Sequence, residues 1–482
     1  MLKTIYKHFG LRKILIITIP LFLLIIILKI SVMQQFRSEV LLTLDTSKQF
    51  QTWGGWEVTI NRWMDDLDTL ENNTQPVQKS ILNKLLSNAV NDLGITAVRF
   101  EFSPSGKFGI EMDNDNEDCN NFDYTQIDWR GFDPYLEDYV IPMKKLIEEH
   151  GEKLTLDLHV ITFDYPKDTI QWHLTEPEEY AELIVGCIKR MDDQFDIIPD
   201  YITPSNEPDN NTVMSKPQLL RNMRALVNRL QSEGYTNIKL RYPDTMRSKN
   251  VLPFFDELQG DYPDLLPYVD TLSFHGYGGL RKSTLNNIRS RAQTTGMKTA
   301  QTEWGDSSNI SRDIYKSLVW ADVSFYQNFG LNWQALKHGN PGEHYILTGF
   351  DGDESNAPYF NGFHPNTSFA YPNSKYYAFQ QYSKYILPKY VRVDIKSSNY
   401  AVKPVAFMSH EGQITIVILN EKHGHTDIVI NNVPVGIYNI TLTDRVHNGI
   451  DMGQMNIGTK VEAGTISFSF NRPGTVTFFS DR

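Results

Sequence analysis

Apolar β-type runs alternate with amphipathic helical runs over most of the chain, and this alternation limits the fold more than any other feature of the sequence. Eight runs have the character of strands: 53–59, 95–102, 154–163, 201–205, 238–242, 271–275, 298–303 and 331–336. Helical patterns fall between them, at 77–93, 135–150, 176–195, 216–233, 285–295 and 311–329. Strands that alternate with helices pair in parallel, and eight such units within roughly 300 residues predict a closed (β/α)8 TIM barrel of the α/β class.

An open, doubly wound sheet is the alternative for the same alternation of strands and helices. Nucleotide-binding sheets of that kind carry a Gly-rich phosphate loop, G-x-G-x-x-G, directly after the first strand. The first strand candidate here contains Trp53-Gly54-Gly55-Trp56 instead, which does not match that loop. The closed barrel is therefore preferred, and residues at the C-terminal ends of its strands become the candidates for chemistry.

The pattern changes after about Lys389, where short alternating strands replace the helices. Turn residues such as Glu411-Gly412 separate the strand candidates, which are 391–395, 405–409, 413–419, 426–430, 438–443, 466–470 and 475–479. This succession predicts an antiparallel β-sandwich over 390–482, behind a catalytic barrel over 38–389. The segment 41–50, which is also β-like, is a candidate for the same sandwich.

Residues 1–37 form a third segment, with a basic start and a long apolar run. The run 14–28 carries no charge, and 14–33 gives about 20 residues, enough to span a bilayer if Lys29 reaches the interface. No A-x-A-like cleavage site follows, so we expect an uncleaved signal anchor that holds a single-pass protein in the membrane, with its large domain at the cell surface. The alternative is a cleaved signal peptide and secretion, which also places the large domain outside the cell.

The distribution of charge excludes one class of partner. The net charge is −12, and residues 1–37 contain six Lys or Arg and no acid, so the remainder of the chain carries −18. Nucleic acids require a basic surface to neutralise the phosphate backbone, and a body this acidic lacks one. We therefore expect no nucleic-acid partner.

Two glutamates stand at the mouths of the predicted fourth and seventh strands. The fourth ends in Ser205-Asn206-Glu207-Pro208, and the seventh in Thr302-Glu303-Trp304. Hydrolysis of a glycosidic bond needs two carboxyl groups beside it, one to protonate the departing oxygen and one to attack the anomeric carbon. The pair therefore predicts a glycoside hydrolase.

These motifs resemble those of clan A, a superfamily of retaining glycosidases, and the wider pattern is most similar to glycoside hydrolase family 30. The resemblance extends over about residues 41–482 and includes the opening 50–55 and the segment 374–388, which in that family closes the barrel and leads into the side sandwich. It implies that Glu207 is the general acid/base and Glu303 the nucleophile. Family 39 of the same clan is the alternative. β-Glucosides, β-xylans and β-1,6-galactans are the substrates that the resemblance implies.

Other polar and aromatic residues at strand ends are candidates for the sugar-binding subsite. Arg99 is expected beside the nucleophile, where its charge would keep Glu303 ionised, or else in an ion pair with Glu101. Asn206 is expected to bind the sugar 2-hydroxyl, since that contact strengthens in the transition state. The remaining candidates are His159, His275, Tyr277 and Trp333, followed by Trp56, Glu57 and Trp304.

No metal or cofactor is expected. The acidic run 111–118 lacks the Gly and the terminal Glu of an EF-hand loop and is interpreted as a solvated loop, and the spacing of Cys119 and Cys187 is typical of neither a metal site nor a redox pair. The predicted function is retaining hydrolysis of the β-glycosidic bonds of an extracellular polysaccharide or glycoside. The alternative is a non-catalytic surface carbohydrate-binding protein on a degenerate barrel, which should have lost one of the two carboxylates. The oligomeric state is not predicted.

Overall fold

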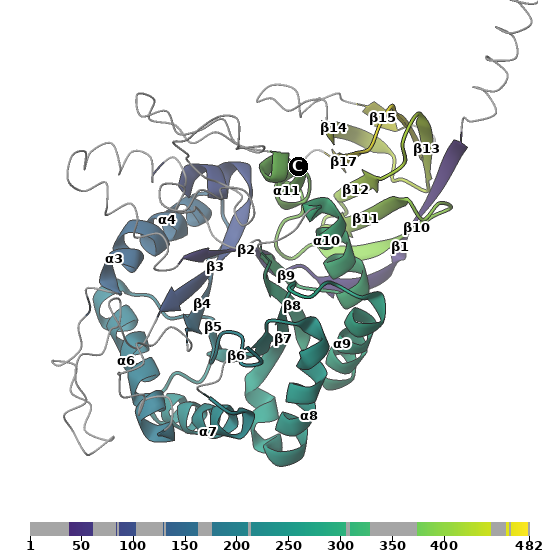
Figure 1. Ribbon diagram of the computed structural model, residues 1–482. Coiled ribbons are helices and arrows are strands. Elements are labelled where there is room, and N and C mark those ends of the chain that lie inside the picture. The colour runs from purple at the N-terminus through teal and green to yellow at the C-terminus, as the bar shows by residue number, and fades with distance from the viewer. Residues whose placement is uncertain are drawn as a thin grey trace, which may run out of the picture.

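A closed parallel barrel and a separate nine-stranded sheet make up the protein in the computed structural model (Figure 1). The structure describes residues 38–60, 83, 86–102, 129, 132–161, 176–210, 214–304, 309–327, 374–444, 459–461 and 464–480. The predicted fold class, a (β/α)8 barrel with a C-terminal antiparallel β-domain, is confirmed.

Eight parallel strands close the barrel in the order in which they occur along the chain. They are β2 (Gly55–Ile60), β3 (Ile95–Phe102), β4 (Thr155–Val160), β5 (Tyr201–Thr203), β6 (Lys239–Thr245), β7 (Val269–His275), β8 (Lys298–Glu303) and β9 (Phe325–Gln327). Almost every residue in these strands is buried, because one face packs inside the barrel and the other packs against helices. All eight strands point the same way, so their C-terminal ends share one mouth.

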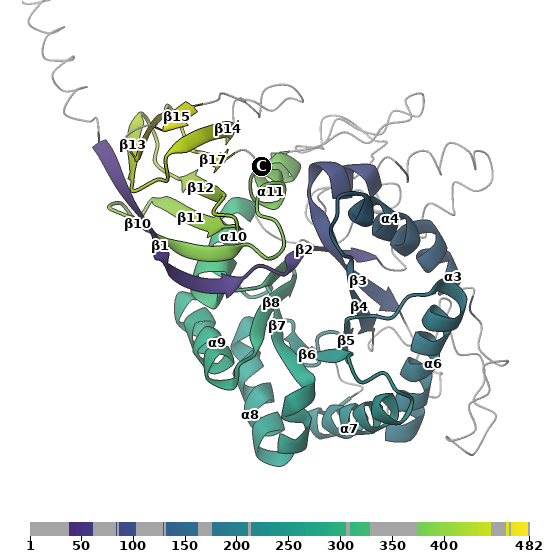
Figure 2. The ribbon, with the colours of Figure 1, turned by 180° about the vertical axis from the view of Figure 1, so that it is seen from behind.

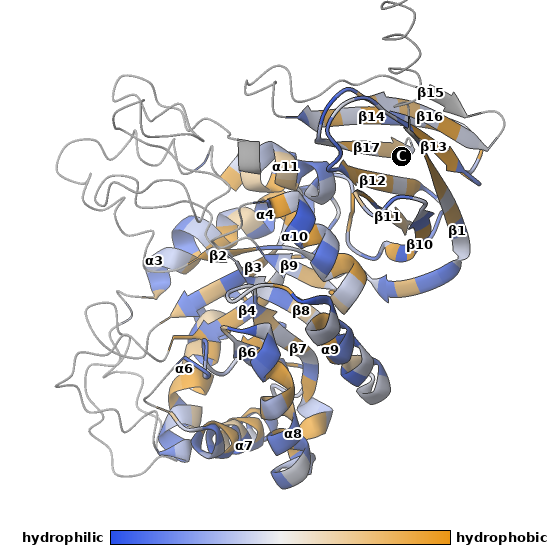
Figure 3. Ribbon diagram, turned by 45° about the vertical axis from the view of Figure 1, so that its right-hand side comes forward, coloured by the Kyte–Doolittle hydropathy of each residue, from blue (hydrophilic) through white to orange (hydrophobic). Residues whose placement is uncertain are grey.

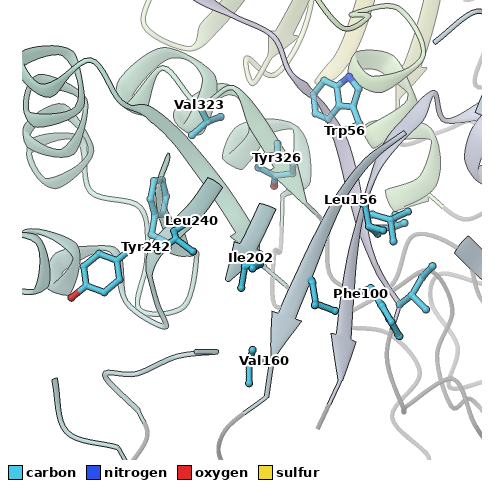
Figure 4. Packing of buried hydrophobic residues seen from close by; sticks show 14 of the residues in the cluster. Trp56, Phe100, Leu156, Val160, Ile202, Leu240, Tyr242, Val323 and Tyr326 are labelled. Carbon is cyan, nitrogen blue, oxygen red and sulfur yellow. The ribbon is translucent and has the colours of Figure 1, made fainter. Parts of the chain in front are cut away.

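Helices surround the barrel on its outside, as both views of the ribbon show (Figures 1 and 2). The larger ones are α4 (Ile141–Glu149), α6 (Pro177–Phe195), α7 (Lys216–Ser232), α8 (Val251–Asp261), α9 (Lys282–Thr295), α10 (Ile310–Lys316) and α11 (Ser374–Ser383). Shorter helical turns are η2 (Asn88–Asp92), α3 (Asp133–Tyr135), η5 (Leu136–Val140), η6 (Ser248–Asn250), η7 (Pro263–Tyr268) and η8 (Ser317–Ala321). Apolar side chains of the strands and helices form one large cluster, part of which Figure 4 shows.

The last barrel strand differs from the prediction. Residues 325–327, expected within a helix over 311–329, form β9, which pairs with β8 and β2 and closes the barrel. The helix ends at Ala321, because Asp322 adopts a left-handed conformation with φ 53°. Apolar residues at helical spacing continue through 311–329, so this pattern does not reveal the short strand, whose aromatic residues are buried. The strand predicted at 331–336 lies outside the described residues.

The second sheet contains one strand from far upstream. β1 (Ser38–Thr52) lies between β10 (Val391–Ser397), with which it pairs antiparallel, and β13 (Thr426–Asn431), with which it pairs in parallel. The segment 41–50 thus joins this domain, and the first barrel strand begins at Gly55, within the predicted strand 53–59. The other strands are β11 (Val402–Met408), β12 (Ile414–Asn420), β14 (Gly436–Asp444), β15 (Thr459–Val461), β16 (Thr465–Phe470) and β17 (Gly474–Ser480). Hydrophobic residues gather on β12 and β13 (Figure 3).

Tryptophans at the start of the barrel join the two domains. Trp53 and Trp56 pack together with ring centroids 4.4 Å apart, and Trp53 also contacts Phe407 of β11. Trp56 packs against Phe379 of α11 and donates its indole N–H to the carbonyl of Ile386 at 2.8 Å. Trp56, a sequence candidate for substrate binding, is therefore a fully buried core residue, which is a correction to that assignment.

Among the described residues, no helix is both long enough and apolar enough to cross a membrane. The predicted anchor at 14–33 lies outside the described residues.

Candidate active site

The two candidate carboxylates come from strands on different sides of the barrel mouth. Glu303 is the last residue of β8, and Glu207 follows β5 in a turn where its φ is 45°. The backbone N–H of Glu207 donates to the carbonyl of Asp244 at 3.1 Å, which ties this turn to the end of β6. Both glutamates are more than nine-tenths buried. Non-glycine residues rarely adopt a positive φ, so the surrounding structure must hold Glu207 in place.

The side chains of Glu207 and Glu303 approach each other closely. One side-chain ligand atom from each of Glu207, Glu303 and His275 lies within 4.8 Å of the others. Carboxyl pairs of inverting glycosidases stand about 6.5–9.5 Å apart to admit a water molecule, whereas retaining pairs stand about 5–5.5 Å apart. An approach of single side-chain oxygens to within 4.8 Å favours the shorter of these two ranges.

Arg99 of β3 binds Glu303 directly. Its Nη1 donates to Glu303 Oε2 at 2.9 Å and to the carbonyl of Thr302 at 2.8 Å. Its Nη2 also lies 2.5 Å from Oε1 of Glu101, so both partners considered from the sequence are present. Burial alone would lower the pKa of Arg99, but the charges of Glu101 and Glu303 raise it. The guanidinium is thus a permanent positive charge beside Glu303.

Tyr277 holds the other oxygen of the same carboxylate. It lies two residues after β7, and its hydroxyl donates to Glu303 Oε1 at 2.8 Å. Each oxygen of Glu303 therefore has its own donor, Arg99 on Oε2 and Tyr277 on Oε1. Two donors on separate oxygens fix the plane of the carboxylate.

Asn206 and His159 share the second arm of the guanidinium. Arg99 Nη2 donates to Asn206 Oδ1 at 2.7 Å and lies 2.9 Å from His159 Nε2. The same Nε2 of His159 lies 3.1 Å from Asn206 Oδ1, so this nitrogen stands between a donor and an acceptor. Burial and the charge of Arg99 place the pKa of His159 well below its ordinary value, which favours a neutral ring.

His275, at the end of β7, contacts carboxylates through both ring nitrogens. Nδ1 lies 2.9 Å from Glu207 Oε1, and Nε2 lies 3.0 Å from Asp244 Oδ2. Burial alone would lower the pKa of His275, but Glu303, Asp244 and Glu207 raise it to about 10. Both ring nitrogens thus have acidic partners, and the contact of His275 with the sugar stays a prediction.

Asp244 is a residue of this site that the sequence did not indicate. It follows Pro243 near the end of β6, where its φ is 60°, and its Oδ1 accepts from the hydroxyl of Thr302 at 2.5 Å. Although burial opposes ionisation, His275 and its hydrogen bond, together with His159 and Arg99, hold the pKa of Asp244 far below its usual range. The predicted strand 238–242 ends before Asp244. Only the position of Asp244 near the barrel mouth could have identified this residue from the sequence.

Glu57 lies elsewhere in the barrel. Its Oε1 accepts from Arg241 Nη1 at 2.7 Å, and the same nitrogen lies 3.2 Å from Asp157 Oδ2. All three side chains are fully buried, and burial raises the pKa of Glu57 and of Asp157 despite the nearby Arg241. The guanidinium also lies against the rings of Tyr201 and Phe325. Glu57 is thus part of a buried ion cluster, which corrects its assignment to substrate binding.

Trp304 stays beside the catalytic strands. It follows Glu303, is 8% exposed, and packs so tightly over Gly276 that a Cβ on that glycine would overlap the indole ring. Gly276 in turn donates its N–H to the carbonyl of Glu303 at 2.8 Å. Trp333, Cys119 and the acidic run 111–118 lie outside the described residues.

The group formed by Glu207, His275 and Glu303 has the residue types of a metal site, but its bonding does not suit one. A metal ion needs a neutral imidazole with a free lone pair. Both nitrogens of His275 face carboxylate oxygens, and the neighbouring acids raise its pKa to about 10, which favours the protonated ring over a metal ligand. The arrangement therefore favours acid–base and nucleophilic chemistry.

Comparison with known proteins agrees with this architecture. Residues 391–467 match the family model described as the glycosyl hydrolase family 30 beta sandwich domain. No curated protein sequence matches the chain.

Solved structures share the whole described architecture. The catalytic domain of GH30 xylanase C from Talaromyces cellulolyticus superposes with a TM-score of 0.66 at 16% identity, over 92% of this chain and 100% of that one. A GH30 endoxylanase from Clostridium papyrosolvens C71 gives 0.63 at 17% identity, with coverage of 92% and 100%. An endo-β-1,6-glucanase gives 0.60 at 16% identity, with coverage of 92% and 94%. The resemblance to family 30 is thus confirmed by sequence in the side domain and by fold elsewhere.

Proposed function

We propose that this protein is a retaining β-glycosidase in which Glu303 is the nucleophile and Glu207 the general acid/base. The observation that carries the proposal is the close approach of the two carboxylates, within 4.8 Å, at the C-terminal ends of barrel strands. Their different partners support different roles. Glu303 faces the cation Arg99 and the hydroxyl of Tyr277, whereas Glu207 faces an imidazole that can exchange a proton.

In the first step, an oxygen of Glu303 attacks the anomeric carbon while Glu207 protonates the departing glycosidic oxygen. The electron pair of the broken C–O bond stays with the leaving group, and a glycosyl-enzyme ester remains. Arg99 and Tyr277 orient the attacking carboxylate before the reaction, so little reorganisation is needed in the transition state.

In the second step, Glu207 removes a proton from water, and the water oxygen attacks the anomeric carbon from the face that the leaving group vacated. The bond to Glu303 breaks, and its electron pair returns to the carboxylate. Two inversions give net retention. Arg99 holds Asn206 through its Oδ1, and we expect the amide NH2 of Asn206 to bind a sugar hydroxyl in both steps.

The substrate class that we propose is a neutral β-linked polysaccharide, such as a β-xylan or a β-1,6-glucan. Among the solved structures with this fold are two xylanases and an endo-β-1,6-glucanase. The charge of −18 on residues 38–482 disfavours a polyanionic substrate. We also propose that residues 14–33 anchor the enzyme at the cell surface, because this run is apolar and no cleavage site follows it.

A substrate screen with a matched variant tests the proposal. The full chain, purified in detergent, is assayed against β-xylan, β-1,6-glucan, β-1,6-galactan and aryl β-glycosides, beside Glu303→Gln, which keeps the shape of the side chain but removes its charge. We expect release of reducing sugar from at least one substrate by the native protein, with a loss of several orders of magnitude in the variant. A native protein that binds these glycans without hydrolysing any would instead support the carbohydrate-binding alternative.

A further inference from the structure

The acid/base Glu207 is arranged as a carboxylate, although it must deliver a proton. Its Oε1 faces His275 Nδ1 at 2.9 Å, and its Oε2 accepts from Asn210 Nδ2 at 3.1 Å. Burial opposes ionisation, but the hydrogen bond and charge of His275 and the bond from Asn210 lower the pKa of Glu207. A general acid of a glycosidase ordinarily needs a raised pKa. The catalytic proton must therefore be held close to Glu207 on another group.

His275 is the group placed to hold that proton. Its two ring nitrogens face oxygens of Glu207 and Asp244, and an ionised carboxylate can only accept, so with both carboxylates ionised each nitrogen carries a proton. His159 provides an internal contrast, because burial and the charge of Arg99, whose Nη2 lies 2.9 Å from its Nε2, place the pKa of His159 well below its ordinary value. Two buried histidines of one site thus carry different charges because of their partners.

We propose that His275 stores the proton that Glu207 delivers to the leaving group, and that Asp244 holds the imidazolium in position between turnovers. The inference rests on the proposed glycosidase function and adds a third group to its acid–base chemistry. His275 does not touch the substrate in this scheme; it acts through Glu207 and is a positioning residue and proton donor to that carboxylate.

The proton movements balance over the two steps. As the glycosidic C–O bond breaks, the proton on His275 Nδ1 moves to Glu207 and a proton passes from Glu207 to the leaving oxygen. His275 is then neutral and keeps its Nε2 proton toward Asp244. In the second step Glu207 takes a proton from the attacking water and passes one back to His275 Nδ1. No other acid or base is required.

The position of Glu303 links this proton transfer to the attack on the sugar. Glu303 Oε2 lies 3.7 Å from His275 Nδ1, so its negative charge helps to keep the proton on the ring. When Glu303 forms the covalent bond it loses that charge, and His275 holds its proton less firmly at the moment when the leaving group needs it. The charge returns when the ester is hydrolysed, and His275 recovers its proton.

The protonation of His275 depends on the charged and titratable groups near it among the described residues. Around the ring stand Glu207 after β5, Asp244 on β6, Glu303 on β8, His159 on β4 and Tyr277 after β7, while Arg99 on β3 binds Glu303. Among these, Glu303 is the charge that changes when the ester forms. Its removal should therefore be the main influence on His275 during turnover.

Nitrogen NMR of the full chain carrying 15N-histidine tests the proposal without a substrate. His275→Gln identifies the His275 signals among those of the 12 histidines. We expect both ring nitrogens of His275 to be protonated at pH 7 to 9 in the native protein. In Glu303→Gln, which imitates the uncharged nucleophile, the second proton should be lost at a pH lower by roughly one to three units. Glu411→Gln, an exposed change in the side domain, should leave the titration unaltered.

A native His275 with one proton at pH 7, or an equal titration in Glu303→Gln and the native protein, would overturn the proposal. If Glu303→Gln does not fold, Asp244→Asn supplies the second test, since it too removes a negative charge beside the ring and should lower the same titration. In Asp244→Asn the alkaline limb of the pH–rate profile should move to lower pH by about as much as the titration of His275. If His275 titrates as expected but the native protein hydrolyses no glycan, the proposed glycosidase function is refuted, while the location of the proton on His275 stands. Failure of the function and failure of this inference therefore give different results.

Discussion

Tyr277 donates its hydroxyl to Oε1 of Glu303 at 2.8 Å, the carboxylate oxygen that Arg99 does not bind. The two donors reach Glu303 from different strands, Arg99 from β3 and Tyr277 from the residues after β7. The tyrosine hydroxyl is neutral and the guanidinium is charged, so their contributions can be separated by substitution.

Replacing Tyr277 with Phe removes this donor and keeps the ring. Hydrogen bonds to charged groups contribute about 1.5–3 kcal/mol, so losing this one in the transition state should lower kcat/KM roughly ten- to hundred-fold. Tyr400→Phe is the matched control, because Tyr400 is 93% exposed on the side domain and should leave the rate unchanged. Native activity in Tyr277→Phe would show that its bond to Glu303 plays no part in the reaction.

Replacing Glu207 with Ala should affect substrates according to their leaving groups. Aryl glycosides with good leaving groups need little protonation, so their first step should be largely spared, whereas poor leaving groups should lose about 10²- to 10⁴-fold. Pre-steady-state release of the aryl group measures this step. Equal losses for good and poor leaving groups would contradict the acid/base role.

The protonated state of His275 should make the protein less stable in alkali. Its pKa rises from 6.5 to about 10 on folding, so the folded state binds the extra proton over that interval. The resulting stabilisation is complete below pH 6.5 and is lost as the pH rises through about 10. Urea unfolding across pH 6.5–10 should therefore give a falling free energy of unfolding in the native protein and a flatter profile in His275→Gln. His425→Gln, at an exposed histidine of the side domain, should keep the native slope.

Gly276 should not tolerate a side chain. A Cβ at this position would overlap the ring of Trp304, which is held next to Glu303. Gly276→Ala should lower the free energy of unfolding by about 1–3 kcal/mol and reduce activity, because the ring or the strand must move. Gly260→Ala in α8 is the control: a Cβ there meets no atom within 4 Å, and the change should stabilise the helix by about 0.5–1 kcal/mol. Equal stability of the two variants would contradict this account of the packing.

The barrel could be predicted from sequence because each long strand is a run of apolar residues between helical patterns. Strand β9 could not be predicted in the same way, since its three residues follow directly from an amphipathic helix. Its place depends on pairing with β2 and β8, which are distant in sequence. Helical spacing over 311–329 therefore predicts a helix that ends too late in the chain, beyond Ala321.

The candidate site was predictable where a residue lies at a strand end with a motif around it, as for Glu207 and Glu303. Trp56 and Glu57 show the limit of that reasoning. Alternation along β2 places them on opposite faces, but only the closed barrel shows that Trp56 packs against α11 and that Glu57 meets Arg241 below the mouth. Asp244 was missed because its role depends on side chains brought together from several strands.

The stereochemistry of hydrolysis tests the central claim most directly. Proton NMR of the first-formed product, recorded before mutarotation, shows which anomer the enzyme releases. One oxygen of Glu207 lies within 4.8 Å of one oxygen of Glu303, an approach that favours the retaining geometry, so we expect the product to keep the anomeric configuration of the substrate. An inverted first product would contradict the covalent mechanism, even if both glutamates proved essential.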